Sequence, residues 1–283
     1  MWSFELERMT AADEGRLAQD VESLGFKALW IPESLGSKEV FAHAGILLAA
    51  TKTLIVASGI ANIWARDPVA MANGARTLQE AYADRFLCGI GVSHKPTIDA
   101  RLGGGYERPF ARMRDYLDAM DKAPYVGPNR TDPPPPRVLA ALGPRMLRLA
   151  AERSLGAHPY FVPVEHTTIA RRELGPDPLL AVEQACTLES DPQRARAVAR
   201  RHMKRYLGLD NYANNLRRLG WTDADLGGEG SDALVDAIVA WGDVTAIRAR
   251  ADAHRANGAD HVCLQVLGDD LAGQLRVIAG ALL

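Results

Sequence analysis

The sequence predicts a single (β/α)₈ barrel. Short runs rich in apolar and β-branched residues alternate with longer amphipathic segments about eight times along the chain, and this alternation is typical of parallel strands joined by crossover helices. The length of 283 residues fits one such domain, because barrels of this kind commonly reach about 250 residues or more. Eight strands in this order predict a closed ring of strands instead of an open sheet.

The first half of the chain contains four predicted strands, at residues 2–7, 28–32, 53–60 and 85–91. Helices are expected from the cap at Thr10 to the stop at Gly25, and over residues 40–50, 68–82 and 110–121. Thr10 can accept a hydrogen bond from an unpaired amide of the first turn. Asp67 followed by Pro68 is a second clear helix start, because proline at the first turn lacks a donor that would have no partner there.

The second half repeats the pattern after four consecutive prolines at 133–136, which we interpret as an extended surface connection. Strands are expected at residues 137–142, 157–162, 179–188 and 261–267. Helices are expected over residues 144–153, 164–174, 190–206 and 243–257, and from the last strand to the C-terminus. Residues 208–242 interrupt this rhythm, and we interpret them as a helical insertion between strands seven and eight, near the barrel mouth.

The composition indicates a cytosolic globular protein. Hydrophobic residues make up 47% and charged residues 24% of the chain, and the formal net charge is −2, so we expect neither a nucleic-acid partner nor a membrane partner. The longest apolar stretch, residues 40–50, is too short to cross a bilayer. Cys88, Cys186 and Cys263 lie inside apolar runs and are expected to be reduced core thiols. No metal-binding motif is present, so we expect no metal.

The barrel topology fixes where chemistry is expected, because the loops after the strands meet at the carboxyl-terminal mouth. These loops contain Glu33 and Ser34, residues 59–64, Ser93 and His94, Leu142 and Gly143, and residues 162–166, and Gln265 lies in the last strand. The run Gly89-Ile90-Gly91 begins like a dinucleotide fingerprint, but the third glycine is missing. We therefore do not expect a Rossmann fold.

Two segments carry a family resemblance, SGIANIWARDP at residues 58–68 and RFLCGIGVS at residues 85–93. They resemble the luciferase-like monooxygenase superfamily, and most of all its branch that uses coenzyme F-420, an 8-hydroxy-5-deazaflavin, which includes the methylenetetrahydromethanopterin reductases. The resemblance extends over nearly the whole chain. It implies a barrel enzyme, usually a homodimer, that transfers a hydride between the deazaflavin and a small organic substrate.

The resemblance also implies a set of cofactor-binding residues. A non-prolyl cis peptide bond between Gly59 and Ile60 is expected to back the deazaflavin ring. For the phosphate-bearing tail, a helix N-terminus with Gly143, the charge of Arg145 and His166 at the start of the next helix form a suitable anion site. The full predicted set is Glu33, Ser58, Gly59, Ile60, Ala61, Asn62, Gly91, Val92, Ser93, Leu142, Gly143, Arg145 and His166.

The predicted catalytic residues are His94, Glu33 and Ser34. Glu33 and Ser34 match an acidic residue and a histidine in the F-420-dependent sugar-phosphate dehydrogenases, and the serine argues against that substrate class. His94 could exchange a proton beside the hydride-transfer carbon, because imidazole titrates near neutrality. Glu33 could bond the cofactor or hold a loop in place.

Two alternatives remain open at this point. The chain could be a monooxygenase that uses FMN as cofactor, because FMN-dependent members share most of these features. It could also be a non-catalytic protein that binds a deazaflavin or flavin, as the missing histidine at position 34 suggests. Trp64, Tyr106, Tyr212 and Trp221 are candidate apolar walls of the mouth, and residues 103–106 together with the insertion are expected to form a lid.

Overall fold

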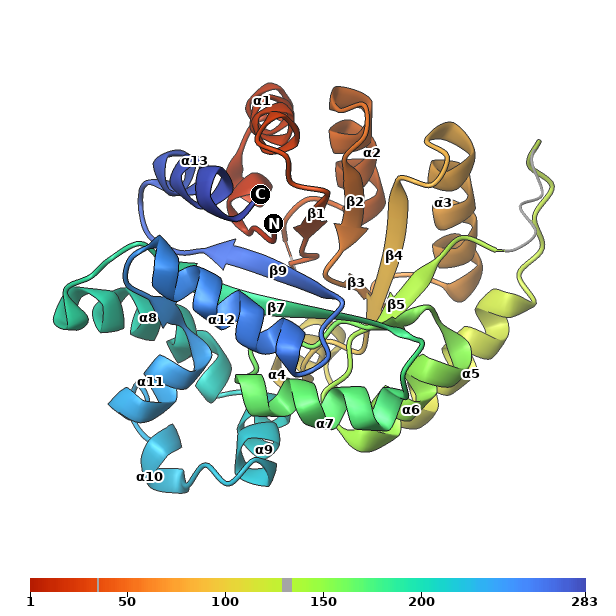
Figure 1. The fold of residues 1–283 in the computed structure, drawn as a ribbon. Coiled ribbons are helices and arrows are strands. Elements are labelled where there is room, and N and C mark those ends of the chain that lie inside the picture. Colours follow the sequence, from red (N-terminus) through yellow and green to blue (C-terminus); the bar gives the residue numbers. More distant parts are fainter. Residues whose placement is uncertain (35, 129–133) are drawn as a thin grey trace. The chain divides into compact units, whose positions relative to one another are not determined.

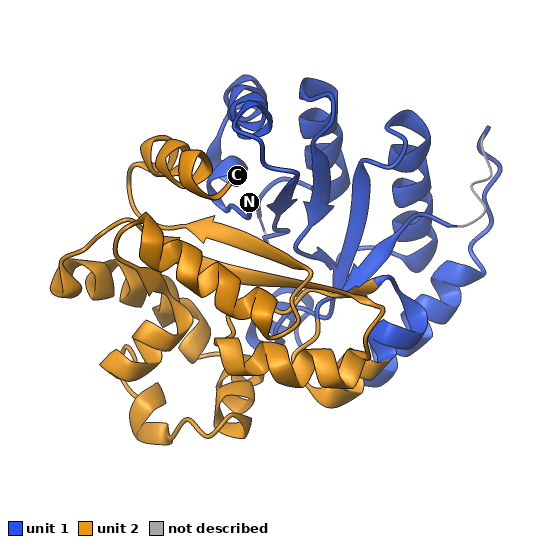
Figure 2. Ribbon diagram, in the orientation of Figure 1, with its two compact units in different colours: residues 1–140, 149–155 blue, residues 141–148, 156–283 orange. Residues whose placement is uncertain are grey.

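The computed structural model describes residues 1–34, 36–128 and 134–283. They form two compact units, one of residues 1–140 with 149–155 and one of residues 141–148 with 156–283 (Figure 2). Each unit is an α/β structure in which parallel strands alternate with helices (Figure 1). The predicted α/β class is therefore confirmed, whereas the closed ring, the single domain and the place of the insertion stay predictions.

The first unit contains a parallel sheet with the strand order β1-β2-β4-β5. These strands are β1 (Ala28–Ile31), β2 (Ile55–Ser58), β4 (Phe86–Gly91) and β5 (Arg137–Leu139), and the short β3 (Ala61–Asn62) pairs with the end of β4. Most of the strand residues are buried. Burial on both faces explains why the strands are almost continuously apolar.

Four helices of the first unit begin within one residue of their predicted starts, and the helix at Lys95–Leu102 is an additional one. The helices are α1 (Ala11–Ser23), α2 (Val40–Ala50), α3 (Pro68–Ala81), α4 (Lys95–Leu102) and α5 (Pro109–Asp121), with a short 3₁₀ helix η1 (Glu5–Arg8) before them. The Thr10 hydroxyl accepts the Asp13 amide at 3.2 Å, and the Asp67 carboxylate accepts the Val69 amide at 2.8 Å. Helix α6 (Pro144–Arg153) has residues in both units.

The prediction of a strand at residues 2–7 is wrong. Trp2 makes one isolated parallel bridge with Trp30, and the chain then turns into the 3₁₀ helix. The Ser3 hydroxyl accepts the Glu5 amide at 3.2 Å, a local bond that competes with an extended conformation. The predicted strand 53–60 is also shorter, and helix α4 was not predicted.

The second unit is centred on β7 (Leu179–Thr187), which pairs in parallel with three other strands. These strands are β6 (Gly156–Ala157), β8 (Ala240–Trp241) and β9 (His261–Val266). The helices are α7 (Val164–Leu174), α8 (Pro192–Leu207), α9 (Asp210–Arg218), α10 (Asp223–Leu226), α11 (Asp232–Ile238), α12 (Val244–Ala256) and α13 (Leu271–Leu282).

Two strand predictions in the second unit need correction. The predicted strand 157–162 contains only the end of β6, which stops at Ala157, and the chain further on turns at Phe161, whose backbone is left-handed with a φ of 57°. Residues 208–242 hold three helices, as expected of a helical segment, but they also end in β8, which was not predicted. In the first unit, β5 likewise ends at Leu139, three residues before its predicted end.

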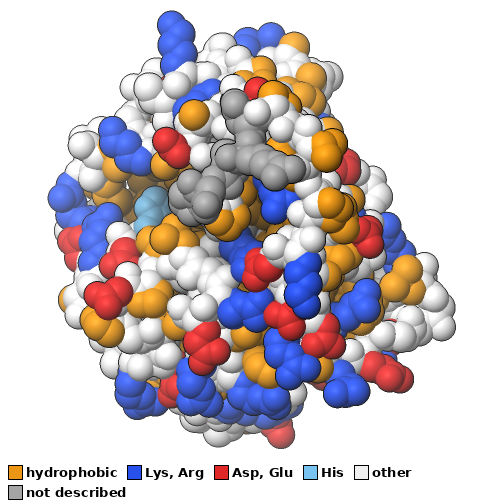
Figure 3. Space-filling model, turned by 90° about the vertical axis from the view of Figure 1, so that its right-hand side faces the viewer, with side chains coloured by type: hydrophobic (Ala, Val, Ile, Leu, Met, Phe, Trp, Pro, Cys, Tyr) orange, Lys and Arg blue, Asp and Glu red, His pale blue; other side chains and the backbone are white. Residues whose placement is uncertain are grey.

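Several predictions about the rest of the chain can also be compared with the structure. Cys88, Cys186 and Cys263 are buried free thiols, as expected. The prediction for the prolines at 133–136 lies partly outside the described residues, and residues 134–136 are not helical. None of the helices described is long and apolar enough to cross a membrane. On the face seen in Figure 3, Lys and Arg side chains are interspersed with Asp and Glu side chains.

Candidate functional site

The end of β2 forms a half-buried platform in the first unit. The Gly59–Ile60 peptide bond is cis, as predicted, and both residues are half-buried. The Gly59 amide donates to the carbonyl oxygen of Ile31 at 2.7 Å, and the Ser58 hydroxyl donates to the carbonyl oxygen of Gly89 at 2.8 Å. The platform is therefore tied to both neighbouring strands, β1 and β4.

Two glycines of β4 make room for this platform. A Cβ atom at Gly89 would lie 1.9 Å from the backbone oxygen of Ser58, and a Cβ atom at Gly91 would lie 2.3 Å from Cδ1 of Ile60. Both distances are far shorter than any real contact between these atoms. The Gly-x-Gly pair that begins like a nucleotide fingerprint thus has a packing reason, and Gly91 determines where the Ile60 side chain lies.

Glu33 forms a nearly buried ion pair with Arg66 at the end of β1. Glu33 Oε2 accepts from the Asn62 amide at 2.7 Å and from Arg66 Nη1 at 2.9 Å, and Oε1 bonds Arg66 Nη2. Only 10% of the Glu33 side chain and 12% of the Arg66 side chain are exposed. Burial opposes the charge of Arg66, but its contacts with Glu33 raise the pKa of Arg66. These contacts favour the second role considered for Glu33, that of holding the loops together.

The segment after β4 is held by two aromatic residues. Trp64 Nε1 donates to the carbonyl oxygen of Val92 at 3.0 Å, and the Tyr106 hydroxyl donates to that of Ser93 at 3.2 Å. The two rings also pack against each other with centroids 5.6 Å apart. Ser93 has a left-handed backbone with a φ of 56°, and the half-buried His94 follows it as the N-cap residue of α4. His94 therefore follows a segment that is held in place by hydrogen bonds from Trp64 and Tyr106.

Ser34 and Glu33 are adjacent in sequence but differ in their contacts. The Ser34 backbone amide donates to Glu7 Oε1 at 2.9 Å, so this part of the loop is tied to η1.

Among the residues that the structure describes, no group of three or more His, Cys, Asp and Glu side chains could hold a metal ion.

In the second unit, Gly143 lies directly before the first turn of α6. His166 Nε2 lies 2.9 Å from the carbonyl oxygen of Leu142, and its side chain is buried. Burial lowers the pKa of His166 to about 4, so the ring is neutral at physiological pH and positions the loop without adding charge. Arg145 is exposed at the start of the helix.

Arg218, which the sequence did not single out, lies beside this loop. A Cβ atom at Gly143 would be 3.6 Å from Nη2 of Arg218. The same nitrogen donates to Asn215 Oδ1 at 3.0 Å, and Arg218 has no carboxylate partner within residues 1–34, 36–128 and 134–283. A helix N-terminus, a glycine and an unneutralised guanidinium are together a donor set suited to a phosphate. The sequence shows only two adjacent arginines at a helix end, and it gives no sign of which one faces Gly143.

A second residue missed from the sequence is Glu183, in the middle of β7. Its Oε2 accepts the Phe161 amide at 3.0 Å, whereas Oε1 has no partner among the described residues. Burial raises the pKa of Glu183 to about 8. Gln265, which the sequence did single out, accepts from the Tyr160 hydroxyl at 2.8 Å. The Tyr212 side chain is buried, and its ring packs against the ring of Tyr160 with centroids 6.3 Å apart.

The sequence of the chain also agrees with one known family. The sequence pattern of the luciferase-like monooxygenase family matches residues 4–261. The chain belongs to this family. The resemblance stated from residues 58–68 and 85–93 is thereby confirmed.

Two curated relatives of this luciferase-like protein are 5,10-methylenetetrahydromethanopterin reductases. The reductase of Archaeoglobus fulgidus is 28% identical over 146 residues, which are 46% of this chain and 44% of the relative. The reductase of Methanolobus tindarius is 24% identical over 207 residues, which are 64% of this chain and 63% of the relative. The matches therefore span less than two thirds of either reductase.

Solved structures show the same fold at low sequence identity. An F-420-dependent secondary alcohol dehydrogenase in complex with an F-420–acetone adduct has a TM-score of 0.76 and 16% identity, with 97% of this chain and 95% of that chain covered. The oxygenating constituent of 3,6-diketocamphane monooxygenase from Pseudomonas putida, in complex with FMN, has a TM-score of 0.68 and 16% identity, with 96% and 92% covered. The luciferase-like fold thus occurs with both cofactors.

Proposed function

We propose that this luciferase-like protein is an F-420-dependent oxidoreductase that transfers a hydride between the deazaflavin and a small organic substrate. The observation that carries the proposal is the platform at Gly59 and Ile60, which is half-buried and lies against Gly91. An apolar platform of this kind suits a flat, aromatic ring. The two reductases among its relatives support the choice of F-420.

The residues of the first unit fit the ring end of such a cofactor. When bound, the deazaflavin would supply the carbon that gives or takes the hydride, while the protein supplies orientation. Ile60 would contact the ring, and the backbone from Ala61 to Asn62 would border it. Gly91, Val92 and Ser93 would shape the opposite edge of the platform.

The loop from Leu142 to Arg145 fits the phosphate of the cofactor. The glycine allows a close approach of the backbone, and the guanidinium of Arg218 lies beside it without a carboxylate partner in the described part of the chain. His166 would act through the carbonyl oxygen of Leu142, which it holds in place.

We assign proton exchange to His94 and positioning to Glu33. The His94 imidazole lies at the N-cap of α4, on the segment that Trp64 and Tyr106 fix, and it would give a proton to the substrate oxygen or nitrogen, or take one from it. Glu33 would act indirectly, through Arg66 and the Asn62 amide. Ser34 is the remaining candidate for a direct contact with the substrate.

Optical titration with F-420 and with FMN tests the choice of cofactor. We expect saturable binding of F-420 and much weaker binding of FMN. The reverse preference would favour the FMN-dependent monooxygenase, which the FMN-bound neighbour supports. Binding of F-420 without turnover on a broad panel of alcohols, aldehydes, imines and enones would favour a non-catalytic carrier.

Two substitutions with a matched control test the proposed phosphate site. Arg218→Gln should weaken F-420 binding about tenfold, because a charge-assisted hydrogen bond is worth about 1.4 kcal/mol or more. Arg217→Gln is the control, since Arg217 is engaged by Asp223 at 2.8 Å. Gly143→Ala fits sterically, because its Cβ would keep 3.6 Å from Arg218, and any loss of affinity would report a blocked approach of the ligand to the backbone. Equal affinities of both arginine variants would contradict the assignment.

A third substitution tests the platform. Gly91→Ala would force the Ile60 side chain to move, because the new Cβ would lie 2.3 Å from Cδ1 of Ile60. We expect a protein that still folds, since the closest atoms, Cδ1 and Cγ1 of Ile60, belong to a side chain that can move, but with F-420 affinity reduced by about tenfold or more. Unchanged affinity would show that the ring does not lie on Ile60.

We also propose that the strands close into one (β/α)₈ barrel, with residues 208–242 as its helical insertion, and that the protein is a homodimer. The TM-score of 0.76 to a protein of this fold, over 97% of the chain, supports the barrel. A crystal structure tests the closure, and sedimentation equilibrium tests the dimer.

A further inference from the structure

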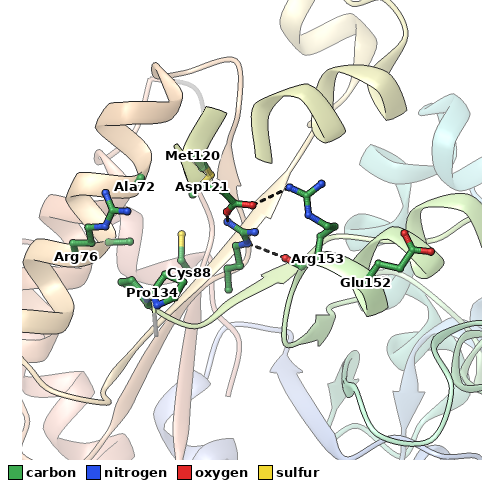
Figure 4. Close-up of a pocket in the computed structure, with 11 residues that line it drawn as sticks. Ala72, Arg76, Cys88, Met120, Asp121, Pro134, Glu152 and Arg153 are labelled. Carbon is green, nitrogen blue, oxygen red and sulfur yellow. Dashed lines mark hydrogen bonds and ion pairs between the residues drawn. The ribbon is translucent and has the colours of Figure 1, made fainter. Parts of the chain in front are cut away.

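A cavity of about 360 Å³ lies at the amino ends of β4 and β5 in the first unit. It is bordered by the middle of α3 and the last residues of α5 and α6 (Figure 4). It is lined by Ala72, Ala75, Arg76, Cys88, Met120, Asp121, Pro134, Pro135, Arg137, Glu152 and Arg153. Its volume is within the usual range for small-molecule sites, about 300 to 1,000 Å³. The candidate cofactor platform lies after the opposite ends of the strands, so this cavity is a separate feature.

The interior of the cavity is apolar and its edge is charged. Ala72, Ala75, Cys88 and Met120 are buried, and the two prolines add a rigid apolar wall. Three arginines face two carboxylates in the lining, so its formal charge is +1. An apolar interior with a small number of polar groups is the usual make-up of a site for an organic molecule.

Two of the three arginines are neutralised by neighbouring acids. Asp121 accepts from Arg137 Nη1 at 2.7 Å and from Arg153 Nη2 at 2.9 Å (Figure 4). Arg153 also pairs with Asp118 at 2.8 Å. Although burial opposes the charge of Asp121, its contacts with both arginines lower its pKa. This group is therefore a closed ion network that needs no further anion.

Arg76 differs from these two arginines. Its Nη1 donates to Asn73 Oδ1 at 3.0 Å and to the carbonyl oxygen of Ala123 at 3.1 Å, and the guanidinium lies over the Tyr125 ring at 5.5 Å. Within the described ranges it has no carboxylate partner, and its Nη2 and Nε donate no hydrogen bond there. These contacts with neutral groups orient the guanidinium at the cavity. Its charge and its remaining N–H groups are therefore available to bind an anion.

We propose that this cavity binds a small organic anion, with a carboxylate on Arg76 and an apolar body among Ala72, Ala75 and Met120. Such a ligand matches the cavity in both shape and charge. Its carboxylate would meet the cation at the edge, and its apolar body would meet the apolar surface inside. A ligand with an aromatic or short aliphatic body fits the volume of about 360 Å³. Glu152, the exposed carboxylate of the lining, opposes anion binding and offers a second way to test the charge requirement.

Methyl NMR on the full-length protein tests this proposal, with [methyl-¹³C]methionine labelling and benzoate as the probe. Met120 lines the cavity, and its signal is assigned with Met120→Leu. We expect benzoate to shift the Met120 signal saturably, and benzamide, which has the same shape without the charge, to bind about tenfold more weakly. Arg76→Gln should weaken benzoate binding about tenfold, whereas Glu152→Gln should strengthen it severalfold. Arg101→Gln, which removes an exposed arginine of α4 outside the lining, is the control.

Three results would overturn the proposal. The first is a Met120 signal that benzoate does not move at tens of millimolar. The second is equal binding of benzoate and benzamide, which would show an apolar cavity without anion selectivity. The third is an affinity that neither Arg76→Gln nor Glu152→Gln changes relative to the control. Glu152 is exposed, so its substitution keeps the test decisive if Arg76→Gln does not fold.

Discussion

The buried carboxyl of Glu183 predicts an unusual dependence of stability on pH. Burial raises its pKa in the folded protein from its usual value of 4.5 to about 8. The folded protein therefore keeps a proton that the unfolded chain releases, and each pH unit between the two values costs stability. The contribution of Glu183 to the free energy of unfolding is highest below about pH 4.5. It is lost as the pH rises to about 8, beyond which the loss is complete.

The size of the effect follows from the two pKa values. One pKa unit corresponds to about 1.4 kcal/mol, so the full loss is about 5 kcal/mol, of which about 4 kcal/mol falls between about pH 5 and pH 9. Glu183→Gln cannot titrate and keeps an oxygen that can accept the Phe161 amide. The free energy of unfolding of the wild type, minus that of the variant, should therefore fall by about 4 kcal/mol over this range.

Urea denaturation followed by tryptophan fluorescence measures this difference. The free energy is extrapolated to water at each pH, and Glu165→Gln, which removes an exposed carboxylate of α7, is the control. A difference between wild type and Glu183→Gln that stays constant from about pH 5 to pH 9 would refute the reasoning. It would mean that the carboxyl is solvated or has a partner that holds it ionised.

Three further substitutions have distinct expected outcomes. Gly89→Ala should lower the free energy of unfolding by about 2 kcal/mol or more, measured by urea denaturation, because its Cβ would lie 1.9 Å from the backbone oxygen of Ser58; a loss below about 0.5 kcal/mol would contradict this. Glu33→Gln should cost about 2 kcal/mol, since it leaves the nearly buried Arg66 with only the more exposed of its two carboxylate partners, Glu39, and Arg66→Met in the same chain should recover part of that loss. His94→Ala should reduce turnover with F-420 about a hundredfold while cofactor affinity stays nearly intact, and unchanged turnover would exclude His94 from the mechanism.

Helix starts were predictable because their determinants are local. Thr10 and Asp67 each accept an amide of the following turn, as their sequence context indicates. Such a bond depends on two or three neighbouring residues and little else. The prediction of these starts therefore did not need the fold.

Strand lengths were less predictable because pairing partners decide them. Trp2 alternates with apolar neighbours like a strand residue, yet it pairs only at one bridge with Trp30. β8 has two residues and exists because Cys186 and Thr187 offer it a free edge. Neither outcome can be obtained from the segment itself, because both depend on distant parts of the chain.

The sequence proposes candidate site residues, but it does not reveal which side chains lie beside them. The barrel rule directed attention to Glu33 and to Gly143, since it needs only the order of strands. It could not reveal that Arg66 neutralises the first or that Arg218 lies beside the second. Both arginines look like ordinary surface residues in the sequence, and only the three-dimensional structure distinguishes them.

The Gly-x-Gly pair in β4 shows why a motif needs its structural context. Residues two apart in a strand face the same side, so Gly89 and Gly91 both face the end of β2. Gly89 meets the backbone of Ser58, which cannot move without breaking the β2–β4 pairing, whereas Gly91 meets the side chain of Ile60, which can. The first glycine is thus required by the fold and the second by the shape of the platform, although the sequence presents them as one motif.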